Sequence, residues 1–284
     1  MKLLKQRMVR RWFLGLIWMG AGLVSAADRM PDLILSETAS GVKYGVWGYA
    51  AESPAPVLIN LGNTIDGILG STYFRQSGNV LAELGYLSVS IDLPAHGKRQ
   101  REGEPEGLAG WRYRLEKGEN FVEENNQRLS EVVDHLIATG VADPDRIALC
   151  GTSRGGFLAL HFAAFDHRIK AVAAYAPVTD LMVLREFEGA ENVPLVAELS
   201  AIRLAEGLAS QPVWIIIGDR DERVGTDESI AVARAITAEA LRRGERGEVE
   251  LHVLPEPKGH TSPRGAADMA ASWIHRQIGM ETKE

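Results

Sequence analysis

The chain has 284 residues, of which 45% are hydrophobic and 24% charged, and this length and composition suffice for one large domain with a substantial buried core. Its formal net charge of −7 argues against binding to nucleic acids or to anionic membrane surfaces. The single cysteine, Cys150, excludes an intramolecular disulfide, and the seven histidines are scattered along the chain, so neither a metal site nor a cofactor is expected.

Residues 1–26 have the pattern of an export signal. Five basic residues precede or border the apolar run 12–24, and small residues end it before Ala27. The basic residues are Lys2, Lys5, Arg7, Arg10 and Arg11. The run is shorter than the roughly 20 residues that span a membrane, so we expect no membrane anchor. The adjacent arginines leave both ordinary secretion and twin-arginine export open, and cleavage would lower the net charge from −7 to −12. The pattern predicts a periplasmic or secreted protein.

Residues 27–284 alternate between short apolar runs and amphipathic segments. The apolar runs predict strands over 32–36, 42–49, 57–60, 87–92, 147–150, 171–175, 212–217 and 249–254. The amphipathic segments predict helices over 72–84, 120–139, 157–164, 227–242 and 266–278. This order predicts a single α/β domain with a mostly parallel sheet of about eight strands and helices on both faces. The first two strands are expected to form an antiparallel pair.

A candidate nucleophile follows the strand at 147–150. Residues 151–155 read Gly-Thr-Ser-Arg-Gly and lie between that strand and the next predicted helix. A serine at such a tight turn exposes its hydroxyl above the sheet, and Gly151 and Gly155 remove the Cβ atoms that would collide there. The motif predicts that Ser153 is a nucleophile; the alternative is a serine that caps a helix.

A nucleophilic serine requires a base and usually a carboxylate, and in this type of fold both follow the serine in the chain. His260 comes after the strand 249–254. Three acidic residues, Asp219, Asp221 and Glu222, follow the strand 212–217. Both loops lie past the carboxyl ends of predicted strands, where open α/β sheets build their sites.

Together these motifs resemble the α/β-hydrolase superfamily. Residues 151–155 are similar to its nucleophile elbow, residues 218–224 to its acid loop, and residues 259–260 to its histidine loop. Within the superfamily the chain most resembles the bacterial serine hydrolases related to dienelactone hydrolases and to the prolyl-oligopeptidase catalytic domain. The resemblance selects Asp221 from the three acidic residues. It implies a catalytic triad of Ser153, Asp221 and His260.

The resemblance also implies an oxyanion hole formed by the backbone N–H groups of Asn63 and Arg154. Leu61 stands where the family often carries histidine, so Gly62 is an alternative to Asn63. His96 resembles a structural histidine of the family, because the catalytic base should follow the serine. The Arg154 side chain could contact a substrate carboxylate, or it could be paired or solvated at the start of the helix.

Two segments are expected to border the site. Residues 177–211 should form a small cap of one or two helices, and residues 94–118 should form the opposite rim. The aromatic residues Trp111, Tyr113 and Phe121 could line an apolar pocket or pack in the core.

The resemblance implies an exported serine hydrolase that cleaves carboxylic esters through an acyl-enzyme and uses no cofactor. Its substrate would be a small-molecule or polymer-derived ester. A prolyl-oligopeptidase-like peptidase or amidase, a thioesterase and an acyltransferase would use the same residues and stay open as alternatives. An inactive hydrolase-fold protein that binds a ligand or a partner is the alternative outside enzymes.

Overall fold

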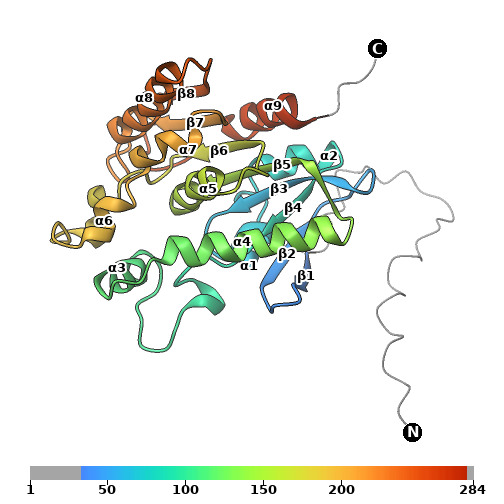
Figure 1. Cartoon of the computed structure of the whole chain (residues 1–284), viewed down its shortest axis with the longest axis horizontal. Helices are drawn as coiled ribbons and strands as arrows, with labels where there is room; N and C mark the ends of the chain where they lie inside the picture. The colour runs from blue at the N-terminus through green and yellow to red at the C-terminus, as the bar shows by residue number, and fades with distance from the viewer. Residues whose placement is uncertain (1–32, 280–284) are drawn as a thin grey trace, which may run out of the picture. The chain divides into compact units, whose positions relative to one another are not determined.

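A computed structural model describes residues 33–279, so the predicted export signal over residues 1–26 lies outside the described residues (Figure 1). The strands are β1 (Ile34–Glu37), β2 (Lys43–Trp47), β3 (Ala55–Leu61), β4 (Leu87–Ser90), β5 (Ala142–Thr152), β6 (Ala171–Tyr175), β7 (Pro212–Gly218) and β8 (Glu248–Leu254). The α-helices are α1 (Ile65–Leu69), α2 (Ser77–Glu83), α3 (Leu108–Glu116), α4 (Phe121–Ala138), α5 (Arg154–Phe165), α6 (Pro194–Glu198), α7 (Ala205–Leu208), α8 (Thr226–Arg242) and α9 (Ala266–Ile278). The 3₁₀ turns are η2 (Gly97–Arg99), η3 (Leu181–Val183), η4 (Arg185–Phe187) and η5 (Ala201–Leu204).

The strands form one 8-stranded sheet in the order β1-β2-β4-β3-β5-β6-β7-β8. Strand β2 pairs antiparallel with β1 and with β4, and every neighbouring pair from β4 to β8 is parallel. The turn between β1 and β2 passes through Gly41 at φ +93°, a conformation that glycine adopts without strain. The predicted α/β fold, with its opening antiparallel pair, is confirmed.

Two apolar layers enclose the sheet, because successive residues of a buried strand face opposite sides. In β3, Val57 and Ile59 belong to one core cluster and Leu58 to the other. The first cluster includes residues of α4, α5 and α8, and the second includes residues of α2 and α9. Figure 1 labels these helices around the sheet. The site loops therefore project from a sheet that is covered on both faces.

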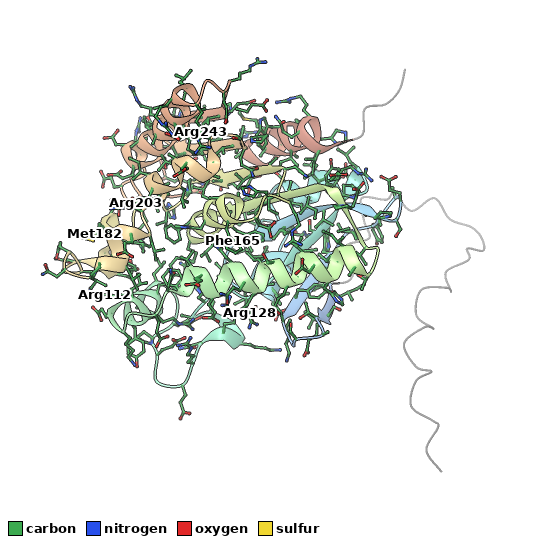
Figure 2. All side chains as sticks on the ribbon, in the orientation of Figure 1. Arg112, Arg128, Phe165, Met182, Arg203 and Arg243 are labelled. Atoms are coloured by element: carbon green, nitrogen blue, oxygen red, sulfur yellow. The ribbon has the colours of Figure 1, made fainter. Side chains whose placement is uncertain are left out.

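The cap segment contains the two helices that the sequence predicts, together with turns that it does not. Between β6 and β7 the chain forms the short α-helices α6 and α7 and the 3₁₀ turns η3, η4 and η5. Leu181, Phe187 and Val196 of this segment are buried. Arg112 of α3 donates hydrogen bonds to the carbonyl oxygens of Glu186 (3.1 Å) and Glu188 (2.7 Å), which joins the rim to the cap; Figure 2 labels Arg112 and Met182 at this edge. The cap is thus short and tied to the rim.

Helix α3 in the rim was not predicted, because its buried face includes a charged residue that interrupts the apolar pattern. Arg114 is buried and donates to both carboxylate oxygens of Glu104, at 2.7 and 2.9 Å. Burial by itself raises the pKa of Glu104, but the hydrogen bonds from Arg114 and from the Arg101 amide hold it below its ordinary value. This ion pair anchors the rim beside the site.

Between residues 33 and 279, none of the helices has the length and apolar character needed to span a membrane.

Candidate active site

Ser153 occupies the turn between the end of β5 and the start of α5. Its φ of +54° is rare for a residue with a side chain and costs backbone free energy. Two backbone hydrogen bonds hold it there: the Ser153 amide donates to the Tyr175 carbonyl at 2.9 Å, and the Val178 amide donates to the Ser153 carbonyl at 3.0 Å. The turn presents the hydroxyl at the carboxyl edge of the sheet.

Glycines at the two ends of the motif allow this turn to be tight. A Cβ on Gly151 would lie 2.3 Å from the carbonyl oxygen of Gly155, and a Cβ on Gly155 would lie 2.1 Å from the carbonyl oxygen of Leu61. Neither distance is possible, so both positions require glycine. The second contact also brings the loop that follows β3 against the first turn of α5.

The structure brings Ser153, Asp221 and His260 together from the loops after β5, β7 and β8. His260 Nε2 lies 3.0 Å from Ser153 Oγ, and His260 Nδ1 lies 2.8 Å from Asp221 Oδ2. A neutral imidazole whose Nδ1–H donates to the carboxylate has Nε2 free to accept the serine proton. The three groups form one hydrogen-bonded series in the order that nucleophilic catalysis requires.

The acid loop distinguishes Asp221 from its neighbours. The Asp221 side chain is fully buried, and its Oδ1 accepts hydrogen bonds from the amides of Arg223 (3.1 Å) and Val224 (3.2 Å). Asp219 instead accepts a hydrogen bond from the Glu256 amide at 2.9 Å and so joins the acid loop to the loop after β8. Asp221 is therefore the carboxylate that contacts the imidazole, while Asp219 holds the loop.

The two predicted oxyanion donors lie on either side of the close contact between the β3 loop and α5. Among residues 33–279, neither the Asn63 amide nor the Arg154 amide donates a hydrogen bond to a protein acceptor. The Arg154 amide is at the first position of α5, where the helix dipole favours negative charge. Asn63 is held by its own contacts, since its carbonyl accepts from the Leu93 amide at 2.9 Å and its Oδ1 from the Thr64 amide at 2.7 Å.

His96 contacts Arg154 rather than Ser153. The imidazole is buried, with Nδ1 2.8 Å from the Pro94 carbonyl oxygen and Nε2 2.7 Å from Nη1 of Arg154. Burial lowers the pKa of His96, and the hydrogen bond to Pro94 only partly opposes this effect. A neutral His96 donates from Nδ1 and accepts the Arg154 hydrogen bond at Nε2, so both of its nitrogens are engaged. Sequence reasoning missed this pair because it joins positions far apart in the chain.

The family comparison agrees with this geometry. The model of the prolyl oligopeptidase family matches residues 73–279, which include all three residues of the hydrogen-bonded series. The chain belongs to the prolyl oligopeptidase family. This match confirms the suspected α/β-hydrolase superfamily and makes the chain a serine hydrolase of this family. No curated protein sequence matches the chain.

Solved structures share the fold of this prolyl oligopeptidase family member. A Bacteroides ovatus protein named as a dipeptidyl aminopeptidase IV has a TM-score of 0.66 at 20% identity, and the match covers 88% of this chain and 36% of that one. A Pyrococcus horikoshii acylaminoacyl peptidase has a TM-score of 0.65 at 15% identity, and the match covers 91% of this chain and 43% of that one. A cold-adapted esterase from an Arctic intertidal metagenomic library has a TM-score of 0.61 at 20% identity, and the match covers 87% of this chain and 93% of that one. The chain thus spans less than half of the two peptidases and most of the esterase.

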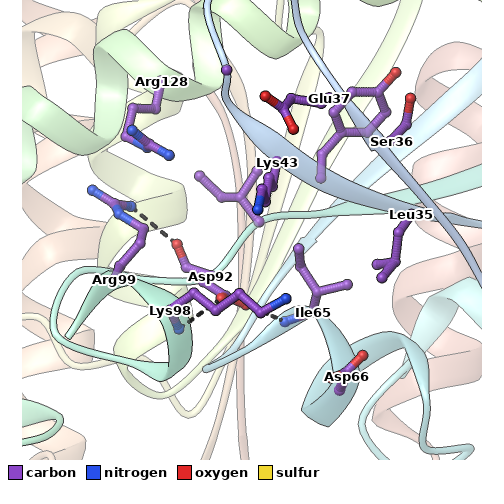
Figure 3. A pocket seen from close by; sticks show the side chains of 13 residues that line it. Leu35, Ser36, Glu37, Lys43, Ile65, Asp66, Asp92, Lys98, Arg99 and Arg128 are labelled. Carbon is purple, nitrogen blue, oxygen red and sulfur yellow. Dashed lines mark hydrogen bonds between the residues drawn. The ribbon is translucent and has the colours of Figure 1, made fainter.

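Among the cavities in the part of the hydrolase that the structure describes, two adjoin loops at the carboxyl ends of the strands. The smaller, of about 240 Å³, is lined by His96, Gly107 and Arg154 among others and adjoins the nucleophile turn. The larger, of about 500 Å³, is shown in Figure 3, and neither cavity is lined by a residue of the hydrogen-bonded series. There, Asp92 accepts hydrogen bonds from the amides of Ile65 (2.8 Å) and Lys98 (3.1 Å), which fixes the loop after β4. Of the two, the smaller cavity is the one that includes Arg154, the residue next to Ser153 in the chain.

Of the three aromatic residues for which the sequence leaves pocket lining or core packing open, two lie in the core of the hydrolase. Trp111 and Phe121 are buried and stacked, with ring centroids 4.5 Å apart, and Trp111 Nε1 donates to the Pro94 carbonyl at 2.7 Å. Tyr113 is half-buried, and the Lys117 ammonium lies 4.0 Å from its ring centroid. Core packing, rather than pocket lining, therefore explains Trp111 and Phe121.

Within residues 33–279, no group of three or more His, Cys, Asp or Glu residues is placed to hold a metal ion.

Proposed function

We propose that this hydrolase cleaves carboxylic esters by nucleophilic catalysis with Ser153, His260 and Asp221. The observation that carries the proposal is the hydrogen-bonded series of these side chains, with distances of 2.8 Å and 3.0 Å. The strained backbone of Ser153 and the complete burial of Asp221 support it, because both features are costly unless they serve a site.

Acylation begins when Ser153 Oγ attacks the ester carbonyl carbon and His260 Nε2 takes the hydroxyl proton. The Asp221 carboxylate stabilises the imidazolium that forms. We assign the Asn63 and Arg154 amides to the oxyanion of the tetrahedral intermediate, where one such donor lowers the barrier by about 3–4 kcal/mol. Collapse of the intermediate breaks the bond to the alcohol oxygen, and His260 returns its proton to the leaving alcohol.

Deacylation repeats these steps with water. His260 removes a proton from a water molecule, and the hydroxide attacks the acyl carbon of the acyl-enzyme. The second tetrahedral intermediate collapses to the free acid, and Ser153 Oγ leaves and regains its proton from His260. The same residues therefore serve both halves of the reaction, and the chain's own groups supply every proton transfer.

Esters are favoured over amides by a relative that matches along most of both chains, the cold-adapted esterase, of which 93% is covered. A peptidase or amidase is the second candidate, supported by the family match and by the acylaminoacyl peptidase, of which 43% is covered. Both candidates use the same side chains, so acyl-group and leaving-group preference depends on the shape of the cavity.

A substrate panel tests the choice between them. The purified chain and Ser153→Ala are assayed with short- and long-chain 4-nitrophenyl esters, 4-nitroanilides of N-acetylated amino acids, and acyl thioesters. We expect the short-chain aryl esters to have the highest kcat/KM, and Ser153→Ala to lower it by about 10³-fold or more. A higher kcat/KM for the anilides or the thioesters would replace the ester proposal by the corresponding alternative.

We also propose that the hydrolase is exported, on the basis of the basic, apolar and small-residue order of residues 1–26. Expression of the full chain in a bacterium, followed by fractionation and N-terminal sequencing, tests this. The expected product is periplasmic or secreted and begins at Ala27. Full-length protein that stays in the cytoplasm would contradict the proposal.

A further inference from the structure

Arg154 follows Ser153 in the chain, and its guanidinium has no carboxylate within salt-bridge distance among residues 33–279. Its single side-chain hydrogen bond in that range goes from Nη1 to His96 Nε2, at 2.7 Å. An arginine side chain carries five N–H donors in a planar fork. Most of this fork is therefore unoccupied by protein acceptors, and Arg154 lines the smaller cavity.

His96 orients the fork without neutralising it. The buried imidazole stands 2.8 Å from the Pro94 carbonyl, which also accepts a hydrogen bond from Trp111 Nε1. A neutral His96 offers Arg154 an acceptor but no negative charge. The hydrogen bond thus directs the guanidinium, which forms no direct ion pair with a carboxylate among residues 33–279.

Charged side chains of both signs surround Arg154: Glu106, Glu186 and Arg223. Glu186 is engaged by Arg223, whose Nη2 lies 2.7 and 2.8 Å from its two carboxylate oxygens. Glu106 is exposed at the cavity rim. Burial lowers the pKa of Arg154, and the positive charge of Arg223 lowers it further, while Glu186 and Glu106 act in the opposite direction. A partly buried cation in this setting gains free energy when an anion enters the cavity.

The space in front of Arg154 is kept open by Gly107. A Cβ at this position would lie 3.3 Å from Arg154 Nη1, and the residue has φ +70°, where other residues are strained. The cavity therefore combines an open approach, a fixed cationic fork and a position one residue along the chain from Ser153.

We propose that Arg154 binds a carboxylate carried by the substrate, so that the preferred esters bear an acidic group a few bonds from the scissile carbonyl. This inference rests on the proposed esterase function. A carboxylate can accept two parallel hydrogen bonds from a guanidinium fork, and this geometry distinguishes it from a neutral polar group. Monoesters of dicarboxylic acids and esters of hydroxybenzoic acids are the simplest compounds with this chemistry.

The test compares charged and neutral esters of matched size. On the acyl side, the mono-4-nitrophenyl ester of adipic acid is compared with 4-nitrophenyl heptanoate; on the alcohol side, 4-acetoxybenzoate is compared with its methyl ester. We expect kcat/KM to favour the charged member of at least one pair, and this ratio to fall about tenfold in Arg154→Gln, mainly through a higher KM. The ratio cancels any effect of the substitution on the oxyanion amide. The preference should also weaken as ionic strength rises.

Glu106→Gln provides the matched control, since it removes one charge of opposite sign from the same cavity. It should raise the charged-to-neutral ratio. Arg154→Lys keeps the positive charge but lacks the fork, and it should retain part of the preference. Wild type that hydrolyses the neutral esters without preferring either charged one would overturn this inference and leave the esterase proposal intact. Protein that hydrolyses none of the four esters would overturn both.

Discussion

Asp221 is the residue on which the orientation of the imidazole depends. Its side chain is fully buried, and its two oxygens divide their contacts between His260 and the amides of its own loop. Asp221→Asn removes the charge that stabilises the imidazolium and favours the wrong imidazole tautomer, so we predict that kcat falls by about 10⁴-fold. Steady-state kinetics with a 4-nitrophenyl ester measure this effect.

Asp219→Asn is the matched control on the same loop, two residues before Asp221. Asp219 is partly exposed, and its contact is to the Glu256 amide, so this variant should lose less than about tenfold in kcat. Equal losses in the two variants, or a larger loss for Asp219→Asn, would show that the wrong carboxylate has been assigned.

At the scale of single residues, the sequence predicts the members of the hydrogen-bonded series but not all of their neighbours. The resemblance of residues 218–224 to the acid loop of the family selects Asp221, and the structure places that carboxylate against His260. The partner of Arg154 could not be predicted, because no spacing rule connects it with His96, 58 residues away. A short motif predicts which residues react, but contacts between loops depend on how the whole sheet is built.

At the scale of an element, the nucleophile turn depends on the absence of a side chain at Gly155. Gly155→Ala would place a Cβ 2.1 Å from the Leu61 carbonyl oxygen, which neither backbone can avoid without moving. We predict a loss of at least about 2 kcal/mol in the free energy of unfolding, although alanine favours helices, together with a large loss of kcat. Urea unfolding and the ester assay measure the two effects.

Gly189→Ala separates this crowding from an ordinary loss of glycine. Gly189 has φ +79° and nothing within 4 Å of a Cβ built there, so only backbone strain of about 1 kcal/mol is expected, with kcat little changed. If Gly155→Ala proved no worse than Gly189→Ala in stability and in kcat, the close approach of the β3 loop to α5 would not be required.

The elements show why strands were predicted better than the rim and cap helices. The parallel strands are buried on both faces and read as continuous apolar runs, such as residues 57–59 within β3. Helix α3 buries Arg114 beside Trp111, and the cap is divided into turns of three to five residues, so neither has a helical apolar period. Their structure is set by contacts between segments rather than by local pattern.

At the scale of the whole molecule, buried histidines link stability to pH. His161 in α5 is buried, and its Nε2 lies 3.0 Å from the Leu199 carbonyl oxygen. Burial lowers the pKa of His161 to about 4. The unfolded chain has the ordinary histidine pKa of about 6.5 and so binds more protons between these values. The contribution of the neutral His161 to the free energy of unfolding is therefore fully present above about pH 6.5 and is lost as the pH falls through about 4.

Replacement of this histidine isolates the effect. His161→Gln keeps a hydrogen-bond donor but does not titrate, so its free energy of unfolding relative to wild type should improve by up to about 3 kcal/mol between pH 7 and pH 4. Urea titrations at several pH values measure the difference. A difference that stays constant across this range would contradict the account of a neutral, buried His161.

The central claim for the whole molecule is that three distant loops make Ser153 a nucleophile, and a fluorophosphonate probe tests it most directly. Intact-mass measurement of the folded chain should show one adduct, peptide mapping should place it on Ser153, and Ser153→Ala should carry none. Folded wild-type protein that stays unlabelled, or an adduct that persists in Ser153→Ala, would contradict the claim.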